Sequence, residues 1–433
     1  MKRLLLGGVL AIASMRPARA ETKVALGEAE VVAIALRAHP TIDAANAARD
    51  AADAQADAAF RARIPDLQLV GRYARLSSIP FRYRSFDGLA FPQFLDSVSG
   101  RANLTIPLTD AFLGLAAAAR AAGKNAEAAE LQVVATRAEV AYDARAAFLG
   151  FWRKKLALDT ATELVRAAEN NAVDQRNRAA AGTVAKNDVL PFETQLDEAT
   201  MGLELARGEL VAAEASLRTF LPELRDRELV VPGLPAEPPE PPRVPAPPVQ
   251  PPRLAVLDRQ ARAAEARSDE ASLDRLPKLS LFASGEVAAP NPRAFVLNRL
   301  VPLPSWEAGA QVQWSFSQLT VGGAQTRAAR AEHAGLVAKL VDAKRKLDAE
   351  RTGTTALLAA AHERVRSAQA RVQHAQDLAR ARRGELEAGT ALPLNVVLAE
   401  SDLARAKNAY VDAFVERALS RARLDFIDGR ATP

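Results

Sequence analysis

Cysteine is absent from the 433-residue chain, so no disulfide can stabilise it and no lipid can be attached through an N-terminal cysteine. Long apolar runs are lacking too. No stretch after residue 20 has the run of about eighteen apolar residues that a membrane-spanning helix needs. The chain must therefore be held together by packing or by association of copies. If it enters a membrane, it must do so as closed β-structure, because open sheet edges cannot lie in hydrocarbon.

Residues with catalytic or metal-binding spacing are also lacking. The chain has 4 histidines, and none stands at a spacing typical of metal ligands. Gly123 and Lys124 look like the end of a phosphate-binding loop, but residues 118 and 125 are alanine and asparagine, which that motif does not allow. No serine lies in the nucleophile pattern of hydrolases. We therefore expect a protein that is not an enzyme and that uses no metal and no cofactor.

The first twenty residues have the pattern of a signal peptide. Lys2 and Arg3 precede an apolar run over residues 4–13, and residues 18–20 (ARA) fit a cleavage site. This pattern predicts export to the periplasm and the removal of four basic residues. The 57 basic residues then become 53 against 52 acidic ones, and the formal charge falls from +5 to +1. So small a charge gives no reason to expect nucleic-acid binding.

The remaining chain repeats itself once. Residues 63–69 (RIPDLQL) recur 212 positions later as residues 275–281 (RLPKLSL), and residues 181–183 (AGT) recur 207 positions later as residues 388–390. The 207-residue offset also relates these pairs: Val189 and Val396, Glu193 and Glu400, Leu196 and Leu403. Similar pieces in the same order at near-constant spacing indicate two homologous halves.

The repeat predicts a domain organisation with a proline-rich junction. We expect a signal peptide over 1–20, a first repeat over 21–231, a linker over 232–252 and a second repeat over 253–430. The linker has eleven prolines in twenty-one residues, which excludes helix and central strand and favours extended polyproline. At about 3.1 Å per residue it could reach roughly 65 Å, either as a strap around a helical body or as an untethered linker.

Each half is expected to contain a helix, two strands and a long helical hairpin. The first half predicts helix over 26–62, strands over 67–74 and 101–108, a long helix over 109–180 and a returning helix over 188–220. The second half repeats the strands over 279–283 and 311–316, and its returning helix covers 394–427. The first long helix would measure about 108 Å, and apolar residues seven apart within it indicate a coiled-coil seam. Gly182 and Gly389 end the two long helices.

Four amphipathic strands are too few to close a barrel, since known barrels need about eight or more. The helices are rich in alanine and charge and offer no broad apolar face on which a sheet could pack. Several copies of the chain must therefore contribute strands. The fold class expected from the residues is mainly α with a small β part, and it requires self-association.

The chain resembles the TolC-like outer membrane efflux protein family. The resemblance rests on the repeat, on residues 63–67 (RIPDL) and 275–279 (RLPKL) before the strands, and on the two Ala-Gly-Thr hairpins. It implies a homotrimer with a long coiled-coil α-barrel and a 12-stranded transmembrane β-barrel to which each chain contributes four strands. It also implies an exit duct from periplasm to exterior for a tripartite efflux pump or a type I secretion system. The implied partners are a periplasmic adaptor, an inner-membrane transporter and outer-membrane lipid.

By the same resemblance, the two hairpins form the periplasmic tips, where the duct narrows and the adaptor docks. The residues implied for this site are Gly182, Thr183, Lys186, Asp188, Gly389, Thr390 and Asn395. Acidic residues often follow the glycine in this family, and Asp188 matches that pattern. Asn395, Leu398 and Ala391 depart from it in the second half, which puts charge-based gating there in doubt. Alternatively, Asp188 serves as a helix N-cap, alone or in addition.

Two further expectations concern the loops and the class of protein. Arg82, Arg84, Arg293 and Arg299 are expected either to contact lipopolysaccharide phosphates or to be ordinary solvated charges. Aromatic residues near the strands, Tyr73, Phe81, Trp306 and Trp314, fit an interfacial girdle or packing at the barrel mouth.

The main alternative function is a periplasmic coiled-coil scaffold or adaptor that is not inserted in the outer membrane. Two hairpins, two strand pairs and no anchor disfavour it.

Overall fold

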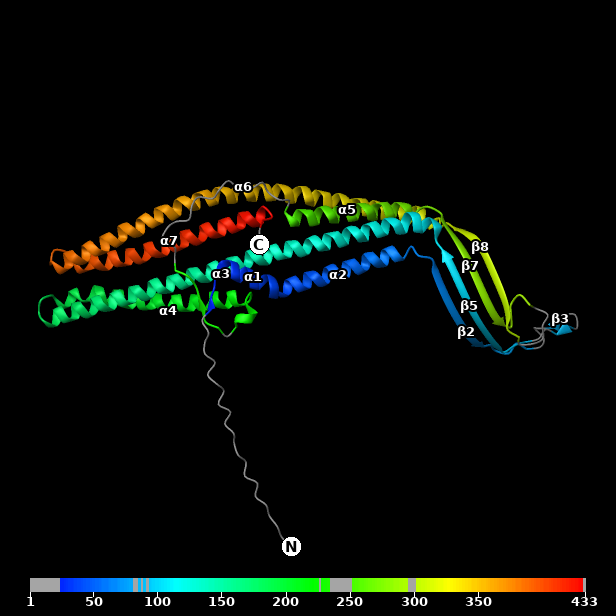
Figure 1. The fold of residues 1–433 in the computed structure, drawn as a ribbon, viewed down its shortest axis with the longest axis horizontal. Helices are drawn as coiled ribbons and strands as arrows, with labels where there is room; N and C mark the ends of the chain where they lie inside the picture. The colour runs from blue at the N-terminus through cyan, green and yellow to red at the C-terminus, as the bar shows by residue number, and fades with distance from the viewer. Residues whose placement is uncertain are drawn as a thin grey trace, which may run out of the picture. The chain divides into compact units, whose positions relative to one another are not determined.

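The computed structural model describes residues 24–80, 85–86, 89–90, 93–225, 227–233, 251–294 and 301–430 (Figure 1). The predicted signal peptide, most of the proline-rich linker and Phe81, Arg82, Arg84 and Arg299 lie outside these residues. The chain forms two compact units. The first comprises Met1–His39, Val140–Arg243 and Leu357–Ala422, and the second comprises Pro40–Glu139, Val244–Ala356 and Arg423–Pro433. The long helices α3 (Leu115–Ala180) and α6 (Ser317–Glu387) contribute to both units.

The first unit is built from two helical hairpins. One joins α3 to α4 (Leu190–Arg218), and the other joins α6 to α7 (Pro393–Ile427). The short helix α1 (Glu28–Ala38) buries its apolar face in the same unit, and β1 (Val24–Ala25) pairs in parallel with β6 (Leu229–Val230). Alanine contributes many of the buried positions, which allows the helices to approach closely.

Trp152 of α3 anchors this core. Its ring meets Phe414 of α7 edge-on at 5.4 Å between centroids. Its indole N–H donates to the carbonyl of Pro232 at 2.6 Å. A buried indole needs such an acceptor, so the contact holds the chain at the start of the proline-rich segment against α3.

The second unit contains α2 (Pro40–Arg61), α5 (Pro252–Leu273) and a four-stranded antiparallel sheet. The strands are β2 (Asp66–Arg75), β5 (Asp96–Ile106), β7 (Lys278–Ala289) and β8 (Leu303–Gln313), in the order β2-β5-β7-β8. The two predicted strand pairs are thus joined into one sheet by β5 and β7. A small hairpin, β3 (Ser85–Phe86) with β4 (Leu89–Ala90), lies in the loop after β2.

Several predicted boundaries need correction. The opening helix is two helices, because His39 adopts an extended conformation (φ −83°, ψ 123°) before Pro40. Proline disfavours helical geometry in the preceding residue, which explains the break. The first long helix begins with a π-helical turn over Asp110–Gly114. Strand β8 ends at Gln313, so Trp314 and Phe316 lie beyond it.

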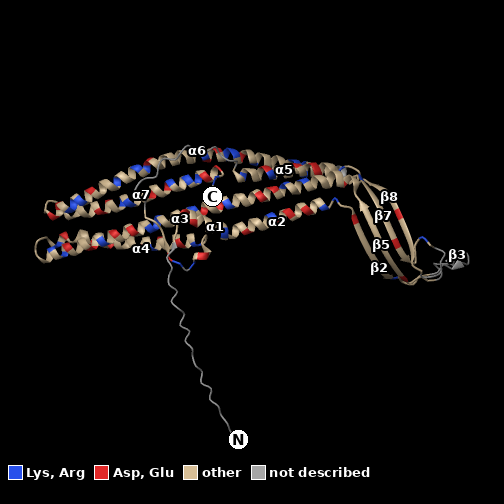
Figure 2. Cartoon of the chain, in the orientation of Figure 1, with Lys and Arg blue, Asp and Glu red and all other residues tan. Residues whose placement is uncertain are grey.

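Charged side chains of both signs are interspersed along the helices (Figure 2). Many form pairs one helical turn apart, for example Arg178 with Asp174 at 3.0 Å. This pattern is that of solvated helix faces. No described helix combines the length and the apolar composition needed to cross a membrane.

Candidate functional site: hairpin tips, sheet faces and the seam between hairpins

The two hairpin tips have the same backbone design. Gly182 and Gly389 both have φ of 75°, in the left-handed region that favours glycine. At the first tip, the backbone N–H and the hydroxyl of Thr183 both donate to the carbonyl of Arg178, at 3.0 and 2.9 Å. At the second, Thr390 does the same to the carbonyl of Glu385, at 2.9 and 3.1 Å. The glycines and threonines of the predicted site therefore build the turn that ends each long helix.

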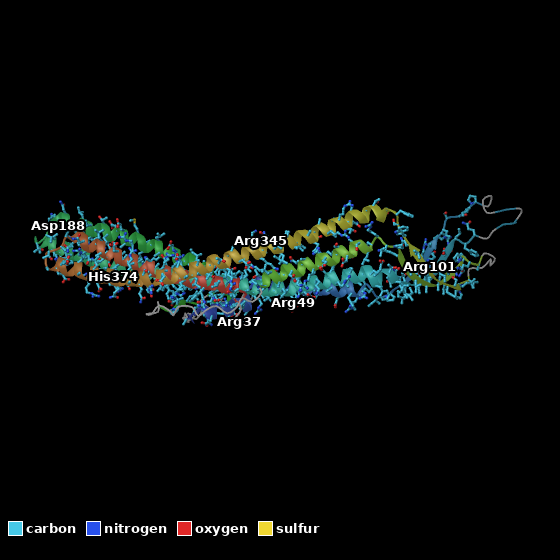
Figure 3. All side chains as sticks on the ribbon, turned by 90° about the horizontal axis from the view of Figure 1, so that it is seen from above. Arg37, Arg49, Arg101, Asp188, Arg345 and His374 are labelled. Atoms are coloured by element: carbon cyan, nitrogen blue, oxygen red, sulfur yellow. The ribbon has the colours of Figure 1, made fainter. Side chains whose placement is uncertain are left out.

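The remaining predicted residues of the first tip are exposed. Lys186 and Asp188 lie in a short 3₁₀ turn before α4, and Asp188 lies at the end of the α3–α4 hairpin (Figure 3). A carboxylate oxygen of Asp188 accepts the backbone N–H of Ala185 at 3.2 Å. Asp188 thus caps the 3₁₀ turn, whereas α4 itself begins without a side-chain cap.

After the glycine, the second tip has three exposed leucines where the first has Lys186 and Asp188. Asn395 is half-buried in the first turn of α7. Around it, Leu392, Leu394 and Leu398 are 69%, 50% and 50% exposed. Large apolar side chains gathered on a surface mark sites of interaction. The residues that follow Gly389 therefore present leucines, whereas the acidic residues of this tip, Glu385 and Glu387, precede the glycine.

The sheet has two unlike faces that follow from its register. On one face, Leu69 of β2 is next to Ala102, Gly285 and Trp306 along the hydrogen-bonded row. On the other face, the neighbouring row contains Gln68, Asn103, Ser284 and Glu307. The apolar face is open in the single chain, since Leu69 is 79% and Trp306 is 77% exposed. A sheet with one apolar and one polar face separates a nonpolar from an aqueous medium.

Several charged groups on the polar face are paired. Arg101 of β5 donates to Glu286 of β7 at 3.0 Å. Glu307 accepts hydrogen bonds from Ser284 at 3.2 Å and from Arg293 at 2.8 Å. Arg293 also donates to the carbonyl of Trp306 at 2.8 Å. Of the arginines suggested for lipopolysaccharide, Arg293 is therefore held by the protein itself.

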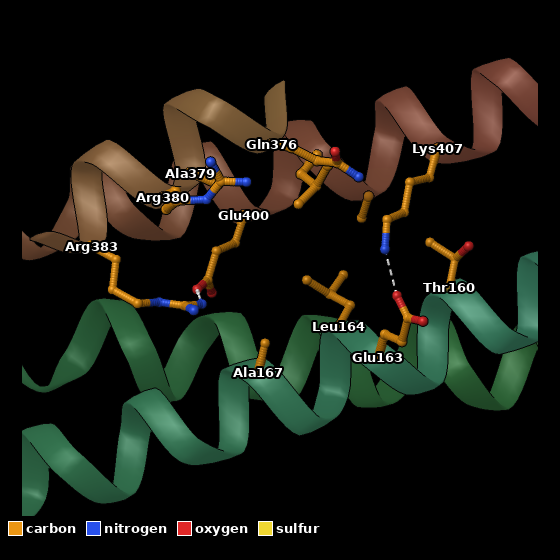
Figure 4. Close-up of a pocket in the computed structure, with 12 residues that line it drawn as sticks. Thr160, Glu163, Leu164, Ala167, Gln376, Ala379, Arg380, Arg383, Glu400 and Lys407 are labelled. Carbon is orange, nitrogen blue, oxygen red and sulfur yellow. Dashed lines mark hydrogen bonds and ion pairs between the residues drawn. The ribbon is translucent and has the colours of Figure 1, made fainter. Parts of the chain in front are cut away.

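A buried carboxylate joins the two hairpins in the first unit. Glu400 of α7 is 5% exposed, and it accepts a hydrogen bond from the amide of Asn171 of α3 at 2.6 Å. It also forms an ion pair with Arg383 of α6, whose side chain is 53% exposed. Lys407 of α7 pairs with Glu163 of α3 along the same seam (Figure 4). A buried charge is tolerated only with such partners, so Glu400 fixes how the hairpins meet.

A cavity of about 320 Å³ lies beside this seam, and residues of α3, α6 and α7 line it. Its charged groups belong to Glu163, Arg380, Arg383, Glu400 and Lys407. Arg380 pairs with Asp377 at 3.3 Å, and the other four form the pairs just described. Among the described residues, no group of three or more histidines, cysteines or acids could hold a metal ion. The arrangement provides a polar seam.

The surroundings of His362 in α6 shift the pKa of its imidazole. Burial lowers its pKa below the ordinary value, and the nearby cations Arg417 and Arg421 lower it further. All three groups lie in the first unit. The neutral form of His362 is therefore the one that the fold favours.

Sequence reasoning missed the buried bridge at Glu400, although the repeat contained a signal for it. Arg176 and Glu193 stand 207 positions before Arg383 and Glu400, and they form the same kind of pair, at 2.9 Å, within the first hairpin. A charge pair kept at both repeats indicates a structural role. The difference in burial between the copies could not be read from the sequence.

One family model matches part of the chain. Residues 31–222 match the family described as outer membrane efflux protein. None of the curated proteins matches the chain in sequence.

The fold is similar to that of solved outer membrane channels. The CmeC channel of Campylobacter jejuni has a TM-score of 0.81 at 13% identity, over 93% of this chain and 86% of that one. VceC of Vibrio cholerae has a TM-score of 0.79 at 17% identity, over 93% and 96%. The MtrE channel of Neisseria gonorrhoeae has a TM-score of 0.75 at 15% identity, over 93% and 88%. The predicted fold class is confirmed.

Proposed function

We propose that this chain, whose residues 31–222 belong to the outer membrane efflux protein family, is the exit duct of a tripartite efflux pump or a type I secretion system. The proposal goes beyond the efflux channel that the family implies, because it specifies the assembly that the duct serves. An efflux protein moves its cargo without changing it, so the chain acts as a conduit and not as an enzyme. Its place is the outer membrane, with a periplasmic portion.

The observation that best supports the proposal is the two-faced sheet with open edges. The apolar face, with Leu69 and Trp306 largely exposed, suits contact with lipid, and the polar face suits a water-filled lumen. Strands β2 and β8 stand at the two edges of the four-stranded sheet that the described residues form. Exposed strand edges must be paired or covered, and three copies would close twelve strands into one ring. The homotrimer is part of this proposal.

The hairpin tips are proposed as the constriction and as the docking site for a periplasmic adaptor. Three features support this: the shared turn at Gly182 and Gly389, the exposed Lys186 and Asp188, and the leucine cluster around Asn395. The adaptor would in turn connect the duct to an inner-membrane transporter. A scaffold that stays in the periplasm would leave the apolar face of the sheet in water, which disfavours that alternative.

The test is a strain that lacks the protein, complemented by plasmid-borne variants. The wild-type chain should restore the export that is lost, whether of a fluorescent efflux dye or of a secreted polypeptide. Substituting Leu392, Leu394 and Leu398 together by serine should abolish export while the protein still reaches the outer membrane as a trimer. The matched control replaces the exposed Leu357, Val337 and Val341 of α6 by serine. Full export by the tip variant would contradict docking at the tips, and a protein found only in the soluble periplasmic fraction would contradict the duct itself.

A further inference from the structure

A short turn after β7 folds back over the polar face of the sheet. It consists of residues 289–294 (APNPRA), in which two prolines flank Asn291. Proline fixes its own φ and restricts the residue before it, so this turn has few conformations open to it. Asn291 is only 6% exposed, although it stands beyond the end of β7. A polar side chain buried at such a place needs hydrogen-bond partners.

The amide of Asn291 has partners for both of its polar atoms. Its nitrogen donates to the carbonyl of Leu303 at 2.9 Å and to the hydroxyl of Ser305 at 3.4 Å, both in β8. Its oxygen accepts the backbone N–H of Arg293 at 2.9 Å. The backbone carbonyl of Asn291 accepts the N–H of Ala294 at 3.0 Å. These bonds close the turn and tie it to β8.

Arg293 ties the turn further along the same strand. Its guanidinium donates to the carboxylate of Glu307 and to the carbonyl of Trp306, each at 2.8 Å. Glu307 lies roughly 14 Å along β8 from Leu303, the first residue of the strand, at about 3.4 Å per residue. The turn therefore folds inward from the end of the sheet and does not extend away from it.

The contacts place the turn on the polar face of the sheet. Ser305 and Glu307 belong to that face, since they flank Trp306 of the apolar face along β8. Ala288 of β7 lies on the polar face as well and is 4% exposed, whereas Val70, elsewhere on this face, is 49% exposed. The turn thus covers the part of the polar face next to the loops and leaves the rest open.

We propose that this turn narrows the outer mouth of the duct and sets the size of the largest solute that can pass. The inference rests on the proposed duct, in which the polar face lines the lumen and the loops stand at the outer end. Three copies of the turn add a layer of chain to the inner wall at three places. Arg293 and Glu307, whose side chains are both 55% exposed, are then the residues that the cargo passes.

This narrowing distinguishes solutes by size more than by charge. Arg293 and Glu307 neutralise each other, and Arg101 and Glu286 do the same in the neighbouring row of the polar face. The field of a close ion pair falls off faster than that of a single charge, and salt screens what remains. The side-chain bonds to β8 also hold the turn in one place, so the narrowing is a permanent feature of the mouth.

The test measures how large a molecule can enter the duct from outside the cell. Because the chain has no cysteine, Gln311→Cys in the full chain provides a single thiol on the polar face of β8, deeper than the turn. Intact cells that carry this parent variant are treated with maleimide-polyethylene glycols of increasing length, and with a small maleimide as the positive control. Long polymers can reach the thiol only through the outer mouth. Labelling of the parent should stop above a certain polymer length.

Variants of this parent then release the turn. Asn291→Ala with Arg293→Ala removes the side-chain bonds to β8, and it should speed labelling several-fold at the lengths that the parent nearly excludes, with no change for the small maleimide. Glu307→Ala cuts only the inner bond and should shift the limit in the same direction, which keeps the test decisive if the double variant fails to assemble. The matched control, Asn103→Ala with Arg72→Ala, removes the same two residue types from the polar face without touching the turn.

The control should leave the length limit where it is in the parent. The inference is overturned if the turn variants keep the parent's limit, or if the control raises it as much as they do. Failure of the proposed function would look different. No polymer of any length would then label intact cells in any variant, whereas every length would label the protein released from the periplasm.

Discussion

Removing the amide of Asn171 should weaken the helical body measurably. Glu400 is 5% exposed and has two partners, the amide of Asn171 at 2.6 Å and the guanidinium of Arg383. Asn171→Leu installs the residue found at the corresponding repeat position, Leu378. A hydrogen bond to a charged group contributes about 1.5–3 kcal/mol. Because Arg383 is half exposed and can still pair with the carboxylate, we expect the lower end, about 1.5 kcal/mol.

The assay is thermal unfolding of the purified protein in detergent, followed by far-ultraviolet circular dichroism. A loss of about 1.5 kcal/mol corresponds to a fall in Tm of about 1.5–2 °C for a chain of this length. The control is Asn170→Leu, the same substitution at the exposed neighbouring residue, which should change Tm little. Equal Tm values for Asn171→Leu and wild type would refute the reasoning, as would an equal loss in the control.

Three other predictions follow from the structure. Gly182→Ala and Gly389→Ala should each destabilise the protein by about 1–2 kcal/mol, because φ is 75° at both positions. Gly202→Ala inside α4, where an added Cβ meets nothing within 4 Å, should instead raise Tm slightly. Equal changes in Tm for the tip variants and the helix variant would refute this. The pKa of His362 is lowered in the folded chain, so the unfolded chain binds a proton at this histidine at higher pH than the folded chain does. The contribution of neutral His362 to stability is therefore complete above the ordinary histidine pKa of about 6.5 and is lost as pH falls below that value. His362→Gln should make Tm less sensitive to acidification over that range, and an unchanged dependence of Tm on pH would contradict the assignment. Trp306→Arg on the apolar face of the sheet should reduce the amount of heat-resistant trimer in the outer membrane, because a charge facing lipid costs up to about 2–4 kcal/mol of stability. Gln311→Arg on the polar face should leave that amount unchanged. Equal trimer yields from the two variants would contradict the assignment of the faces.

The sequence was informative where a local rule determines the structure. The glycines at 182 and 389 ended the long helices because only glycine adopts the left-handed turn without strain. The alternation around Leu67 and Leu69 predicted a strand with unlike faces, and β2 has that pattern. The break at His39 was missed although Pro40 was visible, because the surrounding alanines suggested an uninterrupted helix.

The contacts that depend on tertiary structure could not be predicted. Asn171 and Glu400 are 229 positions apart, and nothing local indicates that one will bond the other. The joining of β5 to β7 likewise links the two halves of the chain, and the strand patterns alone left their order open. The polar seam at Glu400 became visible only in the observed contacts.

The central claim is that the sheet and hairpins of one chain are a third of a duct in the outer membrane. The most direct measurement is the native mass of the mature protein extracted from isolated outer membranes with detergent. A mass of three chains, in a particle that needs detergent to stay in solution, is the predicted result. A mass of one chain, from protein that stays in solution without detergent and is recovered from the periplasmic fraction, would contradict the account.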